Sequence, residues 1–114
     1  MFAVIFEVVP HPERKQEYLD IAAALRPKLD DLEGFIFIER FQSLTTPGKL
    51  LALSYWRDEA AVARWRQIEG HREAQTFGRA ALFNEYRLRI AAVVRDYGME
   101  DRDQAPADSR AVHG

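Results

Sequence analysis

The densest group of chemically active side chains lies between Trp65 and Arg79, in the stretch WRQIEGHREAQTFGR. His71, Gln75 and Arg79 are spaced four residues apart, so on a single helix they form one stripe. Histidine has an unperturbed pKa of about 6.5 and is the group best suited to exchange a proton near neutral pH. We therefore predict that His71 is a catalytic acid or base and that Gln75 and Arg79 orient a substrate oxygen.

A purely structural interpretation of the same stripe is also open. His71 would then cap a helix break after Gly70, and Arg79 would pair with a surface acid. Two aromatic residues of the stretch, Trp65 and Phe77, are either the apolar walls of a pocket or ordinary core residues.

Three further residues outside this stretch bear on a binding site. Tyr86 carries a hydroxyl that can hold a polar ligand atom. Glu7 interrupts an apolar strand, so it would suit a base if it were buried in a pocket and would be merely solvated at a rim. Trp56 ends an apolar segment and is expected in the core.

Composition limits the classes of protein that this chain can be. Its 114 residues are 47% hydrophobic, which suits one domain with a real core. The absence of cysteine excludes disulfides, zinc–thiolate sites and a cysteine nucleophile, and favours a cytoplasmic location. A net charge of −2 argues against a nucleic-acid partner. We expect no membrane span and no signal peptide, and His11 and His113 lack companions for a metal site.

The elements that must position these residues follow from periodicity and breakers. Alternating apolar residues predict strands, and an apolar row that includes Tyr18, Leu25 and Leu29 predicts a helix with a kink or early end at Pro27. Asp58 is a good N-cap, and Gly70 is expected to break the helix that follows it. The predicted strands are 2–9, 34–41, 50–56 and 85–97, and the predicted helices are 13–32, 59–67 and 71–83.

This order, βαββαβ, predicts an α+β ferredoxin-like fold with an antiparallel four-stranded sheet over residues 1–98. Residues 99–114 are expected to form a flexible C-terminal tail. The second strand is apolar on both sides, with Phe35, Phe37 and Phe41 on one face and Ile36 and Ile38 on the other. Two helices cover one face only, so the open face is expected to pack against a second copy in a homodimer. In the alternative, the tail folds back over that face.

Three segments resemble the antibiotic biosynthesis monooxygenase (ABM) domain family: LDDLEGFIFIERF, LALSYWRDEAAVARW, and GHREAQTFGR with YRLRIAAVVRDYG. The resemblance covers residues 2–98. It implies a dimeric α/β barrel with a pocket between sheet and helices, and a monooxygenase that oxidises a small aromatic, phenolic or quinol substrate without a cofactor. In such a site His71 is the base, Arg79 and Gln75 stabilise the anion, and Trp65 and Phe77 are apolar walls.

Haem-degrading relatives in the same superfamily provide a second interpretation. Trp65 matches their tryptophan, but Gln75 stands where they have a haem-ligating histidine, and strand 2–9 offers Ile5 or Phe6 instead of asparagine. An amide is a poor iron ligand beside imidazole, so a haem-binding or haem-degrading activity ranks second. A non-catalytic ligand-binding or stress-response dimer is the third.

Overall fold

The computed structural model describes residues 1–75 and 82–114, and for residues 69–75 it describes the backbone alone. A short 3-10 turn, Pro12–Arg14, precedes the first helix. The elements are β1 (Phe2–Pro10), α1 (Lys15–Asp30), β2 (Phe35–Gln42), β3 (Leu50–Trp56), α2 (Glu59–Gln75), β4 (Phe83–Ala92) and α4 (Ala107–His113). The predicted ferredoxin-like α+β fold is thereby confirmed.

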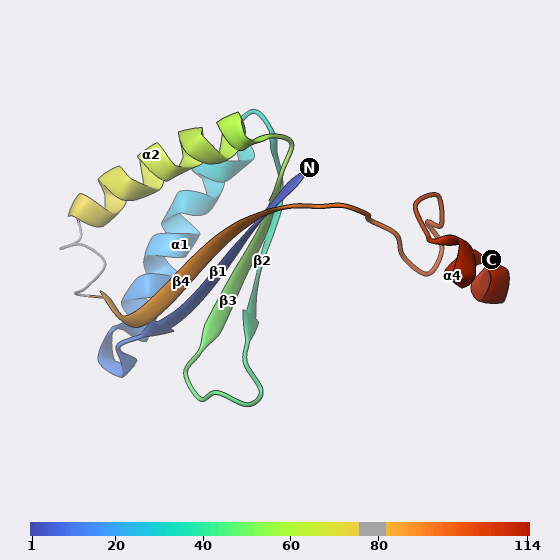
Figure 1. The fold of residues 1–114 in the computed structure, drawn as a ribbon. Coiled ribbons are helices and arrows are strands. Elements are labelled where there is room, and N and C mark those ends of the chain that lie inside the picture. Colours follow the sequence, from blue (N-terminus) through green and yellow to red (C-terminus); the bar gives the residue numbers. More distant parts are fainter. Residues whose placement is uncertain (76–81) are drawn as a thin grey trace.

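The sheet has the strand order β2-β3-β1-β4, and all its neighbours are antiparallel. In the centre, Val4 of β1 is paired with Ser54 of β3 on one side and with Ile90 of β4 on the other. Figure 1 shows α1 and α2 on the same side of this sheet. The side chains of these paired residues therefore face the helices together.

A bulge in β2 changes which of its side chains face inward. Phe35 is paired with Trp56 and Phe37 with the adjacent Tyr55, so Ile36 is an extra residue in the strand. Phe35 and Ile38 consequently pack against the core, whereas Ile36, Phe37 and Phe41 are 53%, 46% and 43% exposed. The predicted grouping of Phe35 with Phe37 and Phe41 is wrong, because the bulge inserts one residue into the alternation.

Neither predicted helix breaker ends its helix. α1 runs through Pro27 to Asp30, because Leu25 and Leu29 on either side of the proline are buried and hold the last turn on the sheet. α2 continues past Gly70 to Gln75. A glycine in a helix interior costs only about 1 kcal/mol, which the buried residues earlier in α2 offset. Residues 76–81 of the predicted third helix lie outside the described residues.

β4 ends at Ala92, five residues earlier than the predicted strand. Ala92 is paired with Phe2, the first residue of β1, and the Val93 N–H donates to the Met1 carbonyl at 3.0 Å. β1 begins at Phe2, and the β1–β4 ladder ends with this pair.

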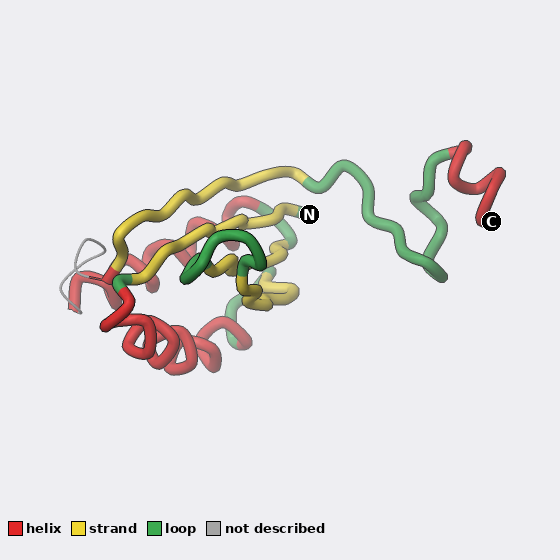
Figure 2. Tube along the Cα trace, turned by 90° about the horizontal axis from the view of Figure 1, so that it is seen from below, coloured by secondary structure: helices red, strands yellow, loops and turns green. Residues whose placement is uncertain are grey.

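Residues 93–114 extend away from the sheet and helices (Figures 1 and 2). The radius of gyration is 16.6 Å, whereas a compact domain of this length has a value of about 13 Å. Contacts within the segment include the Arg102 guanidinium 5.4 Å from the Tyr97 ring centroid. In this arrangement the tail leaves the open face of the sheet uncovered, contrary to the alternative in which it folds back.

Asp58 caps α2 as predicted. Its Oδ1 accepts a hydrogen bond from the Ala61 N–H at 2.9 Å. This backbone hydrogen bond, and next the hydrogen bond from the Arg57 side chain, hold the pKa of Asp58 below its usual value. Both bonds favour the ionised form of the carboxyl group.

The Asp58 cap makes stability depend on pH. Its folded-state pKa lies below the unfolded value, so the stabilisation is present at neutral pH and is lost as pH falls through the lowered pKa. We expect Asp58→Ala to lower Tm at pH 7 by roughly a few degrees, and the difference from the natural chain to shrink towards pH 3. Thermal unfolding followed by circular dichroism measures both. Asp58→Asn, which keeps an acceptor, is the control, and an equal deficit at both pH values contradicts the assignment.

Candidate functional site

A pocket lies between the sheet and the two long helices, and its cavity volume is about 80 Å³. Its polar lining side chains are Tyr18, Arg40, Ser54 and Arg66. The apolar lining residues are Val4, Phe6, Ile21, Ala22, Leu25, Leu29, Ile38, Ala52, Val62, Trp65, Leu82, Phe83, Leu88 and Ile90.

Helical and strand periodicities explain this composition. The lining residues of α1 recur every three or four positions, which places them on one helix face. Those of β1, Val4 and Phe6, are two apart and point to the same side of the strand. The predicted apolar row of α1 therefore faces the pocket.

Aromatic rings form the wall of the pocket near the start of β4. The Phe83 ring lies 5.3 Å from the Tyr18 ring and 5.9 Å from the Phe6 ring, both edge-to-face. The Tyr86 ring is 5.9 Å from Phe6 and 6.2 Å from Phe83. Tyr86 is 47% exposed and is not among the lining residues, so it supports the aromatic wall from outside.

The two tryptophans have different positions. Trp56 is fully buried, and its indole N–H donates to the Ser54 hydroxyl at 2.8 Å. It is a core residue, as predicted. The Trp65 ring stacks on it at 6.4 Å between centroids and with 27° between planes. Trp65 also lines the pocket, where the sequence predicted an apolar wall.

Glu7 lies on the opposite face of the sheet, because it alternates with the inward-facing Phe6 and Val8 of β1. Its carboxylate is 3.0 Å from an Arg89 nitrogen and 3.7 Å from Lys49 Nζ. Glu7 is not among the lining residues. Of the two positions considered for Glu7, the structure shows the one outside the pocket.

The predicted catalytic residues belong to the least described part of the chain. His71 and Gln75 lie in α2, but their side chains are outside the described residues, as are Phe77 and Arg79 entirely. Of the two strand positions compared with the haem-degrading relatives, Phe6 lines the pocket and Ile5 points to the other face. Among the described side chains, those of residues 1–68 and 82–114, His, Asp and Glu form no group of three that could hold a metal ion.

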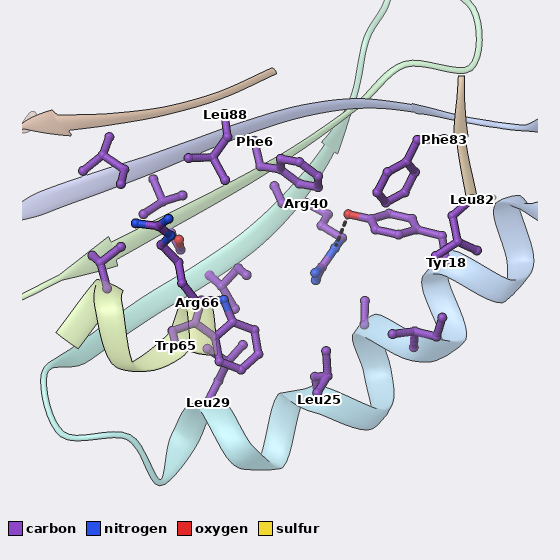
Figure 3. A pocket seen from close by; sticks show the side chains of 18 residues that line it. Phe6, Tyr18, Leu25, Leu29, Arg40, Trp65, Arg66, Leu82, Phe83 and Leu88 are labelled. Atoms are coloured by element: carbon purple, nitrogen blue, oxygen red, sulfur yellow. Dashed lines mark hydrogen bonds between the residues drawn. The ribbon is translucent and has the colours of Figure 1, made fainter. Parts of the chain in front are cut away.

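Sequence reasoning missed Arg40 and Arg66 as pocket residues. Arg66 follows Trp65 on α2, and Figure 3 shows its side chain reaching toward the sheet on the side of Leu88. Arg40 is two residues from Ile38 on β2 and shares its inward face. A basic residue in a largely apolar strand was the available signal for Arg40, but the bulge concealed which face it occupied.

Comparison with known proteins agrees with this architecture. The family model for antibiotic biosynthesis monooxygenase matches residues 1–76. A jasmonate monooxygenase ABM of Pyricularia oryzae is 47% identical over 93 residues, which is 82% of this chain and 43% of that protein. This chain thus spans less than half the length of that relative. An uncharacterized protein of Bacillus subtilis is 30% identical over 94 residues, which is 82% of this chain and 80% of that protein.

Solved structures share the fold at lower identity. A protein from Mycobacterium tuberculosis has a TM-score of 0.72 and 17% identity, covering 85% of this chain and 98% of its own. One from Pseudomonas aeruginosa has a TM-score of 0.67 and 18% identity, covering 82% and 94%. No helix in the described part of the chain is long and apolar enough to cross a membrane. The family model, which matches residues 1–76 of the 114, establishes that the chain belongs to the antibiotic biosynthesis monooxygenase (ABM) family.

Proposed function

We propose that this protein is a monooxygenase that acts on a small, mostly apolar molecule in the pocket between the helices and the sheet. The observation that carries the proposal is a largely apolar pocket between the helices and the sheet in a chain of the ABM family. The name of the Pyricularia relative, a jasmonate monooxygenase, supports the same reaction class.

A phenol or quinol is the substrate class that suits a reaction without a cofactor, because such a molecule can supply the electrons. For a phenol oxidised to a quinone, one atom of dioxygen enters the ring and the other leaves as water. The protein has to remove a proton, stabilise the resulting anion and exclude water. We assign proton removal to His71, anion stabilisation to Gln75 and Arg79, and the apolar walls to Trp65 and Phe77, from their order in the sequence.

Oxygen uptake tests this activity directly. The full chain is incubated with a panel of phenols and quinols, with heat-inactivated protein as the blank for spontaneous oxidation. We expect uptake above the blank for at least one compound, and one atom of ¹⁸O from labelled dioxygen in its product. No uptake across the panel, or product without the label, would overturn the proposal.

We also propose that the protein is a homodimer that buries the open face of the sheet. Figure 1 shows that α1 and α2 lie on the other side of the sheet and leave this face open. Its outward side chains, by strand pairing, are Ala3, Ile5, Glu7, Val9, Phe37, Glu39, Phe41, Leu51, Leu53, Tyr55, Glu85, Arg87, Arg89 and Ala91. A largely apolar sheet face of this kind on a monomer favours self-association, and a two-fold dimer closes it.

Phe37→Glu is expected to convert the dimer into folded monomers. The Phe37 side chain is 46% exposed in the single chain, so the substitution leaves the core intact but places a charge in the proposed interface. Sedimentation velocity at micromolar protein gives the mass. Leu44→Glu is the matched control, since Leu44 is fully exposed in the β2–β3 turn. A natural chain that sediments as a monomer contradicts the proposed dimer.

A further inference from the structure

The pocket has a polar end at Tyr18 and Arg40. Arg40 Nε donates to the Tyr18 hydroxyl oxygen at 3.5 Å, a long hydrogen bond, as the dashed line in Figure 3 shows. The guanidinium carbon lies 5.8 Å from the Tyr18 ring centroid. Tyr18 is 7% exposed, so its hydroxyl lies at the inner side of this end, and Arg40 lies closer to solvent.

The charge of Arg40 is not neutralised by an acid of the described chain. Other arginines have carboxylate partners, such as Arg14 with Glu17 at 2.7 Å and Arg89 with Glu7 at 3.0 Å. No ion pair in the described residues includes Arg40, and the pocket lining described above contains two arginines and no acid. The polar end therefore offers several unused N–H donors and one hydroxyl beside an apolar cavity.

Arg26 shows what a structural arginine looks like in the same region. Its guanidinium carbon is 5.6 Å from the Phe35 ring centroid, but it also pairs with Asp30 at 3.5 Å and donates to the Ile38 carbonyl at 3.3 Å. Arg26 is not among the lining residues. Arg40 shares the aromatic contact and lacks the carboxylate, which leaves its charge available to a ligand.

We propose that Tyr18 and Arg40 form a carboxylate-binding subsite, and that the substrate is a small apolar molecule with one carboxylate group. This inference rests on the proposed function of the pocket. An arginine fork matches the two oxygens of a carboxylate, and a tyrosine hydroxyl can donate a third hydrogen bond. A neutral apolar ligand would leave these donors unpaired as the pocket loses water.

The apolar part of the ligand would lie deeper along the same cavity. Leu25 and Leu29 of α1 lie on the helix side, and Phe6 and Leu88 lie on the sheet side (Figure 3). A carboxylate held at Arg40 therefore fixes which end of the molecule extends toward Trp65. Tyr18 and Arg40 are in this sense specificity-determining residues rather than residues of the reaction itself.

Binding of matched acids and esters tests the subsite. Jasmonic acid and methyl jasmonate share one carbon skeleton and differ in charge, and 4-phenylbutanoic acid and its methyl ester form a second pair. Isothermal titration calorimetry on the full chain, without oxygen, measures affinity with no turnover. For at least one pair we expect the acid to bind about tenfold more tightly than the ester. Arg40→Met should remove that preference, and Tyr18→Phe should reduce it.

Arg26→Met is the control, since it removes an arginine with an aromatic contact that does not line the pocket. It should leave the preference unchanged. Equal affinity for acid and ester in both pairs, no binding of either pair, or an Arg40→Met variant that still prefers the acid would overturn the subsite. The two proposals fail separately. Preferential acid binding without oxygen uptake on any bound compound removes only the monooxygenase, whereas uptake on neutral quinols with no acid preference removes only the subsite.

Discussion

Trp65→Ala is expected to lower the free energy of unfolding by about 3 kcal/mol, the lower end of the range for a buried tryptophan. The side chain is 8% exposed and stacks on Trp56, so its removal leaves a space against a fully buried ring. One side of the indole faces the pocket and loses few contacts, which keeps the cost near that lower end. Urea unfolding followed by circular dichroism measures the change.

The paired variants Trp65→Phe and Trp56→Phe separate the pocket from the core. Trp65→Phe enlarges the pocket and should weaken binding of any ligand that reaches it. Trp56→Phe removes the indole N–H that donates to the buried Ser54 hydroxyl, and should cost stability while changing ligand affinity less than Trp65→Phe does. Equal effects of the two variants on binding would mean that Trp65 does not contact the ligand.

His71→Ala is expected to lower kcat by about 100-fold or more, the contribution of a general acid or base. KM should change little, because the apolar pocket rather than His71 supplies most of the proposed binding surface. The measurement is oxygen uptake at saturating substrate with a compound that the natural chain accepts.

His113→Ala is the matched control for this experiment, since His113 lies in α4, outside the body of the domain (Figure 1). A His71→Ala variant with unchanged kcat would remove the base from this position. The interpretation of His71 as a cap after a helix break is wrong, because α2 continues past Gly70 to Gln75. A variant that lost only thermal stability would indicate a structural role for His71 inside α2.

Much of the fold could be predicted because local patterns and tertiary packing agree. The residues of β1 and β3 are mostly apolar, and residues that interrupt strands flank both segments. Their observed limits lie within about a residue of the predicted ones. The Asp58 side chain accepts a hydrogen bond from a backbone N–H three residues later, and this local interaction marks a helix N-terminus. Pro27 and Gly70 are local signals that packing overrides, because each costs less than the burial of the neighbouring helix face provides.

The site was harder to predict because it depends on which face of β2 each residue occupies. Strict alternation assigns Arg40 to the face opposite Phe35, yet both are on the inner side. The sequence placed Tyr18 in an apolar row. A binding role for its hydroxyl follows only from its contact with Arg40. The sequence shows both residues, but it does not show the strand register that brings them together.

The extra residue at Ile36 has a consequence for how homologous chains should be aligned. Without Ile36 the pairs from Phe37–Tyr55 to Gln42–Leu50 stay as they are, and Phe35 stays opposite Trp56. A homologue shorter by one residue here therefore needs its gap at position 36. A gap opened farther along the strand assigns the equivalent of Arg40 to the wrong side, and the ligand-facing arginine then goes unrecognised in comparisons across the family.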